Sequence, residues 1–327
     1  MRLLIFALLI VFSLPIKAHA EDPIKERQQQ ITTILELTRE NIYNYRLMDT
    51  PEWKQFEAFL SSEETLAMNQ KDFVNAFNQE RKKLPFTHYN LRLKTGKSKA
   101  KQKELPFELK TLDQSTALLI VRDWIQDASG MISIVQEIEA TGYENLIIDL
   151  RGNPGGTLDA AVVLGSYLTN QPIDAGVYLT KNWYADHTEG PTTEQIQQFP
   201  FMKDLDFEGF WDMSQNPGFR MVLPGHDRKV FEGDVYVLTD GFTGSTCEPF
   251  VDVIKRQNIG TVIGRTTGGG MLSGAFFPVD DELTLFLPVC DYYTADGYRI
   301  DRVGVKPHIE TRSEDALKKA TELISGK

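Results

Sequence analysis

The residue with the clearest potential for chemistry is Ser245, which follows an apolar segment and a glycine-rich corner in LTDGFTGSTCEPF (238–250). A serine at the start of a helix can serve as a cap, or it can act as a nucleophile. A nucleophilic serine needs a base, and neither histidine nor lysine lies within nine residues of Ser245. The local sequence leaves both roles open, and any base has to come from another part of the chain.

Two glycine-rich turns could bind an anion through their backbone N–H groups. They are DLRGNPGGT (149–157) and GRTTGGGM (264–271). Neither has the Lys-Ser/Thr ending of a phosphate-binding P-loop or the glycine spacing of a dinucleotide-binding loop. A phosphate site therefore has no specific support, and each turn taken alone is also compatible with an ordinary tight turn.

These motifs lie where short apolar segments alternate with helical patterns. TALLIV (116–121), NLIIDL (145–150) and DVYVLT (234–239) read as buried strands, and GTVIG (260–264) begins another. This alternation is typical of βαβ units and predicts an α/β fold with a mostly parallel sheet flanked by helices. The later segment from FFPV to LTLFLPVCDYYT predicts additional antiparallel strands. Sites in such folds form at the carboxyl ends of strands, where Ser245 and both turns are expected.

The chain before this core has a helical pattern. Residues 21–92 are expected to form a helical cap of three helices, the second beginning near Pro51 and the third capped by Ser61 or Ser62. A lysine-rich linker, 93–115, leads to the α/β core, 116–327. Within the core, residues 180–232 predict a long irregular insertion, which could be a lid, a binding loop or surface decoration.

The first twenty residues combine Arg2, a continuous apolar stretch and a small-residue end at Ala20. This layout predicts a secretory signal peptide cleaved after Ala20 and an exported protein, periplasmic or secreted. A retained membrane anchor is the alternative, although the stretch is short for a spanning helix and no stable membrane insertion is expected. Loss of Arg2 and Lys17 changes the formal charge from −11 to −13, which argues against binding to nucleic acid.

The cysteine content is too low for a disulfide framework. Cys247 and Cys290 are the only two cysteines, and they could form one pair or remain as buried thiols, which is the interpretation that we favour. No His, Cys and carboxylate cluster has the spacing of metal ligands. The sequence therefore predicts neither a metal nor a cofactor.

Taken together, NLIIDLRGNPGG, VLTDGFTGSTCEPF, GTVIGRTTGGG and YYTADGYRIDRVGVKP resemble the tail-specific (C-terminal-processing) serine peptidase family. This family includes the core of the tricorn protease and the interphotoreceptor retinoid-binding proteins. The resemblance runs from about Thr116 to Pro307. One branch uses a Ser-Lys dyad, but Gly270 stands where that lysine would fall, and no lysine lies between Lys255 and Lys306. The chain is therefore more similar to the tricorn-like branch, which uses a serine, a histidine and an acid.

Resemblance to that branch implies a complete site. LPFTHYNL (84–91) matches the branch's Ser-His element, and GYRIDRVGVKP (297–307) supplies the acid. Asp301 is shorter than the glutamate common in this branch, so the nearby Asp291, Asp296 and Glu310 stay open as alternatives. The implied residues are the nucleophile Ser245, the base His88, the acid Asp301, the hydroxyl residue Thr87, and the oxyanion-hole N–H groups of Gly155 or Gly156 and of Thr246.

The interval between His88 and Thr116 is too short for the PDZ domain that many members of this family carry. We therefore expect an exported serine endopeptidase that hydrolyses polypeptides through an acyl-enzyme, with substrate selected by the insertion and the helical cap. Two alternatives remain open, namely a non-catalytic protein that binds a ligand or peptide on the same fold, and an esterase that uses the same residues. The substrate and the oligomeric state do not follow from the sequence.

Overall fold

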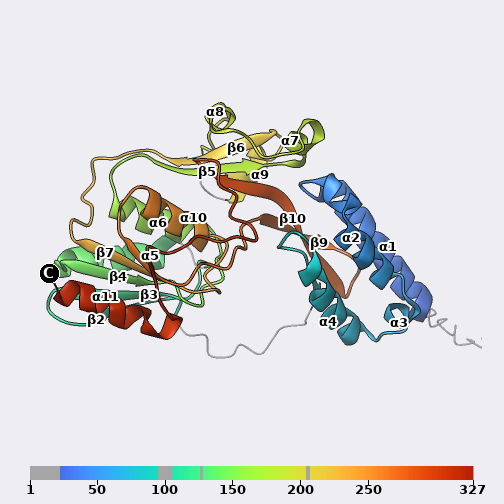
Figure 1. Ribbon diagram of the computed structural model, residues 1–327, viewed down its shortest axis with the longest axis horizontal. Coiled ribbons are helices and arrows are strands. Elements are labelled where there is room, and N and C mark those ends of the chain that lie inside the picture. The colour runs from blue at the N-terminus through green and yellow to red at the C-terminus, as the bar shows by residue number, and fades with distance from the viewer. Residues whose placement is uncertain (1–22, 95–104, 126–127, 204–206, 327) are drawn as a thin grey trace, which may run out of the picture.

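The computed structural model describes residues 23–94, 105–125, 128–203 and 207–326. Figure 1 shows a parallel sheet with its helices at one end of the molecule, helices α1–α4 at the other end, and the long strand β10 running between them. The predicted signal peptide and residues 95–104 of the predicted linker lie outside the described residues.

The parallel sheet has six strands in the order β11-β8-β7-β4-β3-β2. All neighbouring pairs are parallel except β2 with β3, so the prediction of a mostly parallel sheet is confirmed. β2 lies inside the predicted linker, which is therefore not entirely a connection. The strands are β2 (Phe107–Thr111), β3 (Thr116–Val121), β4 (Asn145–Asp149), β7 (Asp234–Thr239), β8 (Thr261–Gly264) and β11 (Ile309–Glu310).

Alternating side chains of these strands pack against helices on both faces, as expected from the period of a strand. Ile148 and Val237 share a core with helices α5 (Ala128–Thr141), α6 (Asp159–Leu168) and α10 (Cys247–Arg256). Their neighbours Ile147 and Leu238 pack instead against α11 (Ala316–Ser325), which follows the 3₁₀ turn η3 (Ser313–Asp315). Both faces of the sheet are therefore covered, and the strand ends remain as the place for a site.

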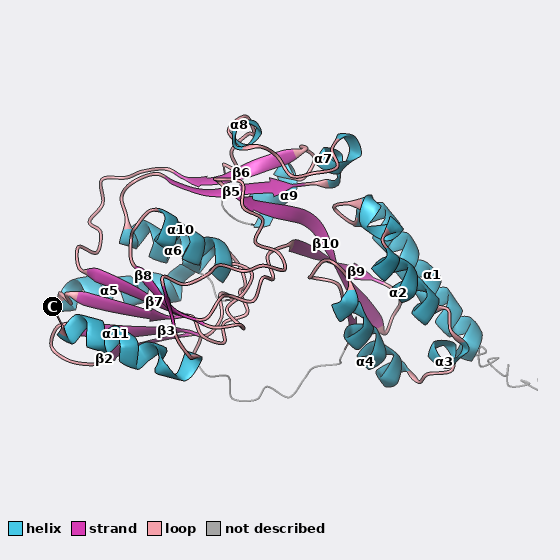
Figure 2. Cartoon of the chain, in the orientation of Figure 1, coloured by secondary structure: helices cyan, strands magenta, loops and turns pink. Residues whose placement is uncertain are grey.

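A second sheet is antiparallel and has the order β1-β10-β5-β6, with β9 paired to β10. Figure 2 shows it crossing from the parallel sheet toward the helical region. The antiparallel strands expected near the end of the chain are confirmed as β9 and β10. The strands are β1 (Asn90–Leu93), β5 (Ile173–Leu179), β6 (Gly218–Leu223), β9 (Ser273–Pro278) and β10 (Leu283–Thr294).

The segment 180–232 is more regular than predicted. Strand β6 lies within it and pairs with β5, from Ile173 opposite Leu223 to Leu179 opposite Gly218. All but one of the β6 residues are buried, so the strand lacks the alternation that would identify it in the sequence. The segment also contains the short helices α7 (Lys181–Asp186), α8 (Thr193–Ile196) and α9 (Phe207–Met213).

The helical region has four α-helices among the described residues, where the sequence predicted three. α2 begins at Pro51 as predicted, and the Thr50 side chain caps it. Ser62 caps only the four-residue α3, and Asn69 caps the longer α4. No described helix has both the length and the apolar character needed to cross a membrane. The elements are α1 (Pro23–Asn41), η1 (Tyr45–Asp49), α2 (Pro51–Leu60), α3 (Glu63–Leu66), α4 (Gln70–Glu80) and η2 (Arg81–Lys83).

The helical region and the antiparallel sheet are joined by one hydrophobic core. Trp53 and Phe77 from the helices pack in the same cluster as Val177 of β5 and Leu285 of β10. Strand β1 adds backbone pairing, with Asn90 opposite Phe286. This pairing fixes the position of the segment just before β1, which carries Thr87 and His88.

Candidate active site

Ser245 lies between the end of β7 and the start of α10, at the carboxyl edge of the parallel sheet. The helix cap is Thr246 rather than Ser245, so the cap interpretation of Ser245 is wrong. The Ser245 side-chain oxygen makes no hydrogen bond to another described residue. Ser245 also adopts a φ of 52°, in the left-handed region that side-chain-bearing residues seldom occupy. Such strain is often found at functional sites, where the surrounding structure maintains it.

The two glycine-rich turns meet at Ser245. A Cβ atom added to Gly155, which has a φ of 101°, would lie 2.5 Å from the Ser245 Cβ. Only glycine therefore allows the 149–157 turn to lie this close to Ser245. The 264–271 turn approaches from the other side through Gly269 and Gly270, and the residue that connects it to Ser245 is Glu248.

Glu248 is completely buried and accepts four hydrogen bonds. One carboxylate oxygen accepts from the N–H groups of Ser245 (3.1 Å) and Gly270 (2.8 Å). The other accepts from the Thr267 hydroxyl (2.6 Å) and the Gly269 N–H (2.8 Å). Burial raises the pKa of Glu248 to about 7, although all four donors oppose the shift. The sequence analysis missed this residue, although a carboxylate in the first turn of a helix is a recognisable signal.

Two backbone N–H groups are free to act as an oxyanion hole. Within the described residues, the amides of Gly156 and Thr246 have no hydrogen-bond acceptor, and both residues line the cavity that contains Ser245. The Gly155 N–H, the alternative donor, instead donates to the Asn153 side-chain oxygen at 2.9 Å, so the geometry favours Gly156. The remaining pair combines a turn amide with an amide at the start of α10, which is the kind of donor set that stabilises developing negative charge.

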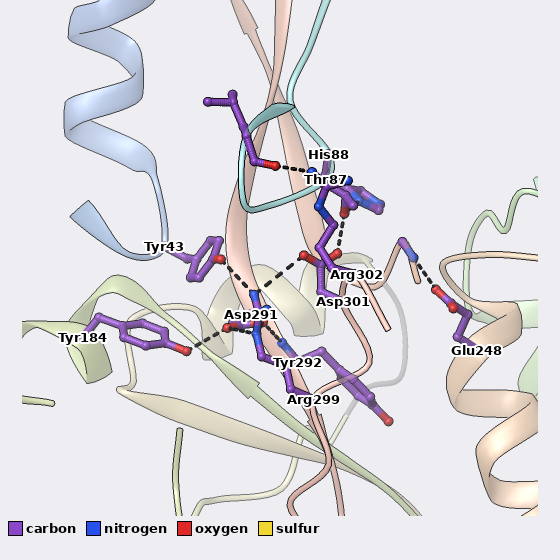
Figure 3. A network of polar contacts seen from close by, with 12 residues as sticks. Tyr43, Thr87, His88, Tyr184, Glu248, Asp291, Tyr292, Arg299, Asp301 and Arg302 are labelled. Atoms are coloured by element: carbon purple, nitrogen blue, oxygen red, sulfur yellow. Dashed lines mark hydrogen bonds and ion pairs between the residues drawn. The ribbon is translucent and has the colours of Figure 1, made fainter. Parts of the chain in front are cut away.

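The wall of the cavity that carries His88 is supported by a chain of hydrogen bonds from His88 through Thr87 to Asp301 (Figure 3). The Thr87 hydroxyl donates to the Asp301 carboxylate at 2.5 Å, and its oxygen lies 2.9 Å from His88 Nδ1. A hydroxyl has one hydrogen to donate, so commitment of that hydrogen to Asp301 makes Nδ1 the donor to Thr87. The second ring nitrogen, Nε2, then carries the lone pair and can accept a proton.

The environment shifts both titrating groups on this wall. Burial, with a smaller effect of the Arg81 charge, lowers the pKa of His88 to about 4. Burial raises the pKa of Asp301 to about 6, and the Thr87 hydrogen bond and the Arg299 charge partly oppose this change. At neutral pH the imidazole is therefore neutral and the carboxylate ionised, which are the states that a general base and its orienting acid require.

Ser245 and His88 line one cavity of about 310 Å³. The structure thus brings together residues from opposite ends of the sequence, as the resemblance implied. His88 also adopts a left-handed conformation, with a φ of 57°. A Cβ atom added to Gly270 would lie 3.8 Å from the His88 ring, so the turn held by Glu248 passes beside the imidazole.

Of the four acids considered, Asp301 alone hydrogen-bonds to Thr87. Asp291 accepts from Tyr184 and Arg299, and Asp296 accepts from Thr294. Glu310 lies on β11, at the far edge of the parallel sheet. The geometry therefore favours Asp301 as the orienting acid.

The other described histidines lie outside the cavity. His187 stacks on Trp183, His226 contacts the Ser166 carbonyl, and His308 accepts a hydrogen bond from the backbone of Val262. Across the described ranges, no group of three or more His, Cys, Asp or Glu side chains is placed to hold a metal ion.

Both cysteines are unpaired and buried. Cys247 lies two residues from Ser245, where its sulfur accepts a hydrogen bond from the Trp124 indole at 3.1 Å. Burial raises the pKa of its thiol to about 12, so Cys247 remains a thiol and does not compete as the nucleophile.

The sequence profile of peptidase family S41 matches residues 115–311, which is more than half of the chain. The chain therefore belongs to peptidase family S41. It is 26% identical over 191 residues to the carboxy-terminal processing protease CtpA of Bacillus subtilis (strain 168), a match that covers 58% of this chain and 34% of the relative. The chain thus matches about a third of the length of this curated relative.

Solved structures share the fold over most of the chain. A lipoprotein from Streptococcus agalactiae has a TM-score of 0.57 at 15% identity, covering 92% of this chain and 96% of that one. The photosystem II D1 C-terminal processing protease has a TM-score of 0.53 at 13% identity, covering 88% of this chain and 94% of that one. At these identities the likeness shows the fold alone, and roles of individual residues rest on the geometry described above.

Proposed function

We propose that this chain is a serine endopeptidase with Ser245 as the nucleophile and His88 as the general base. One observation carries the proposal, namely that Ser245 lines the same cavity as a histidine whose Nδ1 is tied through Thr87 to a buried carboxylate. Membership of family S41 and similarity to a carboxy-terminal processing protease support a peptide substrate. Position 270 is glycine, so a Ser-Lys dyad has no lysine at that place.

The proposed reaction follows from the positions of these groups. Ser245 Oγ attacks the carbonyl carbon of a peptide bond while His88 Nε2 takes the hydroxyl proton. The N–H groups of Gly156 and Thr246 stabilise the resulting oxyanion. The imidazolium then donates its proton to the amide nitrogen, the C–N bond breaks, and an acyl-enzyme remains on Ser245. Attack by water, with His88 again as the base, releases the acid and restores the serine.

The walls of the cavity indicate which side chains a substrate presents. Tyr178, Phe210, Met271 and Phe286 supply apolar and aromatic surface, and Asp159 is the one carboxylate among the described lining residues. No lysine or arginine is among the described residues that line the cavity, so these residues offer a free carboxyl terminus no cationic partner. These features favour cleavage within a chain beside an apolar residue, and they disfavour acidic residues at the same position.

Export belongs to the same proposal. It is supported by the signal-peptide pattern of residues 1–20. Expression of the full chain, followed by N-terminal sequencing of the exported protein, tests it. A first residue of Glu21 is expected, and recovery of the uncleaved chain inside the cell would contradict it.

A fluorophosphonate probe, which reacts with activated serines, tests the proposed nucleophile and base. Wild-type protein is expected to be labelled, whereas Ser245→Ala and His88→Ala are expected to lose at least about 99% of the labelling rate. Ser133→Ala, an exposed serine of α5, is the matched control and keeps the wild-type rate. A wild-type protein that resists labelling and forms no acyl-enzyme with peptides or esters would support the non-catalytic alternative. Turnover of esters without peptides would favour the esterase.

A further inference from the structure

One oxygen of Asp301 has no hydrogen-bond partner among the described residues. The side chain is fully buried, with 0% of its surface exposed. Its Oδ1 atom accepts the Thr87 hydroxyl, whereas Oδ2 accepts no hydrogen bond from any described residue. A buried carboxylate with an unpaired oxygen is costly and needs a compensating charge.

The compensating charge is Arg299, whose Nη2 atom lies 3.7 Å from Asp301 Oδ2. Figure 3 shows the Arg299 guanidinium among Asp291, Tyr43 and Asp301. Its Nε atom donates to both oxygens of Asp291, at 3.1 and 2.9 Å, and Nη2 donates to the Tyr43 hydroxyl at 3.1 Å. Asp291 and Tyr43 thus hold the Arg299 side chain in place, and its positive charge lies beside Asp301 without a hydrogen bond to it.

Among the described residues, none of the other charged or titratable groups of this wall hydrogen-bonds to Asp301. The Arg302 guanidinium donates to the carbonyl oxygens of Lys82 and Leu84. Arg81 acts on His88, where its positive charge lowers the pKa of the imidazole. The Tyr184 hydroxyl donates to Asp291. Arg299 therefore stands between two buried carboxylates of the same wall, Asp291 and Asp301, and its single positive charge is divided between them.

We propose that Arg299 is a positioning residue that keeps Asp301 ionised and thereby sets the tautomer of His88, with Asp291 acting in the opposite direction. The inference rests on the proposed function, because the tautomer matters only if His88 is the base. Arg299 contacts neither substrate nor the reacting atoms, so its effect passes through Asp301, Thr87 and the imidazole in turn.

The tautomer depends on the ionisation of Asp301 because Thr87 has one hydrogen. When Asp301 is ionised, that hydrogen points to the carboxylate, and His88 must donate from Nδ1 and keep its lone pair on Nε2. When Asp301 is protonated, its own O–H can donate to Thr87, and the Thr87 hydrogen turns to Nδ1. The imidazole then carries its hydrogen on Nε2, the nitrogen proposed to accept the Ser245 proton, and it cannot act as the base.

Two substitutions are expected to move the pH dependence in opposite directions. Arg299→Gln removes the positive charge, so the midpoint of the acid limb of the labelling rate should rise by at least about one pH unit, with the wild-type rate largely recovered at high pH. Asp291→Asn leaves more of the Arg299 charge for Asp301, so the midpoint should fall by about half a unit or more. Arg312→Gln, an exposed arginine of the C-terminal region, is the matched control and leaves the midpoint unchanged.

A structural role alone would lower the rate by one factor at all pH values. That result, or shifts of both midpoints in the same direction, would overturn the inference. A carbon-13 NMR titration of the Asp301 carboxyl, assigned with Asp301→Asn, measures the same opposite shifts without any activity. If Arg299→Gln does not fold, Asp291→Asn decides the question by the direction of its shift. Loss of serine-dependent labelling in wild type would reject the proposed function, whereas labelling with unmoved midpoints would reject only this inference.

Discussion

The two walls of the site are built by different means. The nucleophile wall, formed by Ser245, Glu248 and the amides of Gly156 and Thr246, is shaped by backbone geometry and by the ends of the parallel strands. The base wall, formed by Thr87, His88 and Asp301, is shaped by side chains that reach one another from distant parts of the chain. Each wall contains one buried carboxylate, and the contrast between the walls is clearest there.

Both oxygens of Glu248 accept hydrogen bonds, four in all, whereas one oxygen of Asp301 accepts none from the described residues and relies on a charge 3.7 Å away. A carboxylate surrounded by donors fixes the shape of the backbone around it. A carboxylate with one unpaired oxygen and a shared cation responds instead to small changes in charge. If the proposed function holds, Glu248 should mainly maintain the structure of the site, whereas Asp301 should mainly control the protonation of His88. The following predictions test this division.

The largest effect is expected from Asp301→Asn. The amide can present its NH₂ group to Thr87, which turns the Thr87 hydrogen toward His88 and favours the inactive tautomer. The catalytic efficiency, kcat/KM, should fall by roughly 10²- to 10⁴-fold, while the free energy of unfolding changes by about 1 kcal/mol or less. Peptide hydrolysis and urea unfolding measure the two quantities. Asp296→Asn is the control from the same region, and full activity in Asp301→Asn would remove Asp301 from its assigned role.

Glu248→Gln should show the reverse balance. The NH₂ group of glutamine would replace an oxygen that accepts two hydrogen bonds, so two buried donors would lose their acceptor. Above pH 7, where Glu248 is ionised, the free energy of unfolding should fall by about 2–4 kcal/mol and kcat/KM by roughly tenfold. Glu137→Gln, on the exposed side of α5, controls for the change of charge. A stable Glu248→Gln protein with a displaced pH profile would contradict the division of roles.

The pH profile itself gives an effect of intermediate size. The pKa of Asp301 is raised to about 6, so its carboxylate gains a proton as the pH falls through 6, while His88 stays neutral to about pH 4. The wild-type kcat/KM should therefore fall about tenfold for each pH unit below 6. In Asp301→Asn this limb should disappear, and the residual activity should fall only near pH 4. If the wild-type kcat/KM began to fall only near pH 4, the ionisation of Asp301 would not control the tautomer of His88.

Arg302→Gln should give the smallest effect. The Arg302 guanidinium donates to the carbonyl oxygens of Lys82 and Leu84, so it attaches the Asp301 loop to the segment that carries His88. Because β1 pairing and the shared core also hold this segment, we expect a loss of about 1 kcal/mol in stability and less than fivefold in kcat/KM. Thermal unfolding and peptide hydrolysis measure both. A loss as large as that of Asp301→Asn would mean that this contact, rather than the core, positions the base.

The nucleophile wall could largely be predicted from the sequence because its signals are local. Ser245 and the glycines lie in short stretches that follow buried strands, and sheets of this class gather such stretches at one edge. Glu248 was missed although it lies three residues after Ser245. Two of its four donors belong to the 264–271 turn, and their approach depends on the packing of that turn.

The base wall could not be derived from local pattern. Thr87, His88 and Asp301 were placed by resemblance to a family, since nothing near them in the sequence indicates that they meet. Their meeting depends on the pairing of β1 with β10, which joins Asn90 to Phe286. No sequence pattern indicated Arg299, because its proposed role depends on the Asp301 oxygen that is buried without a hydrogen bond in the folded chain. Strand β6 was missed for a related reason, since burial on both faces removes the alternation that marks a strand.

The hydrophobic core shared by α1–α4, β5 and β10 makes the helical region part of one cooperative unit with the sheet that supports the site. If the helices packed only against one another, they could unfold while the strands of the core remained folded. Here the side chains of Leu84, Phe86 and Tyr89, which flank the base, are buried in that same core. We therefore expect loss of helix content and displacement of His88 to occur together when the chain unfolds.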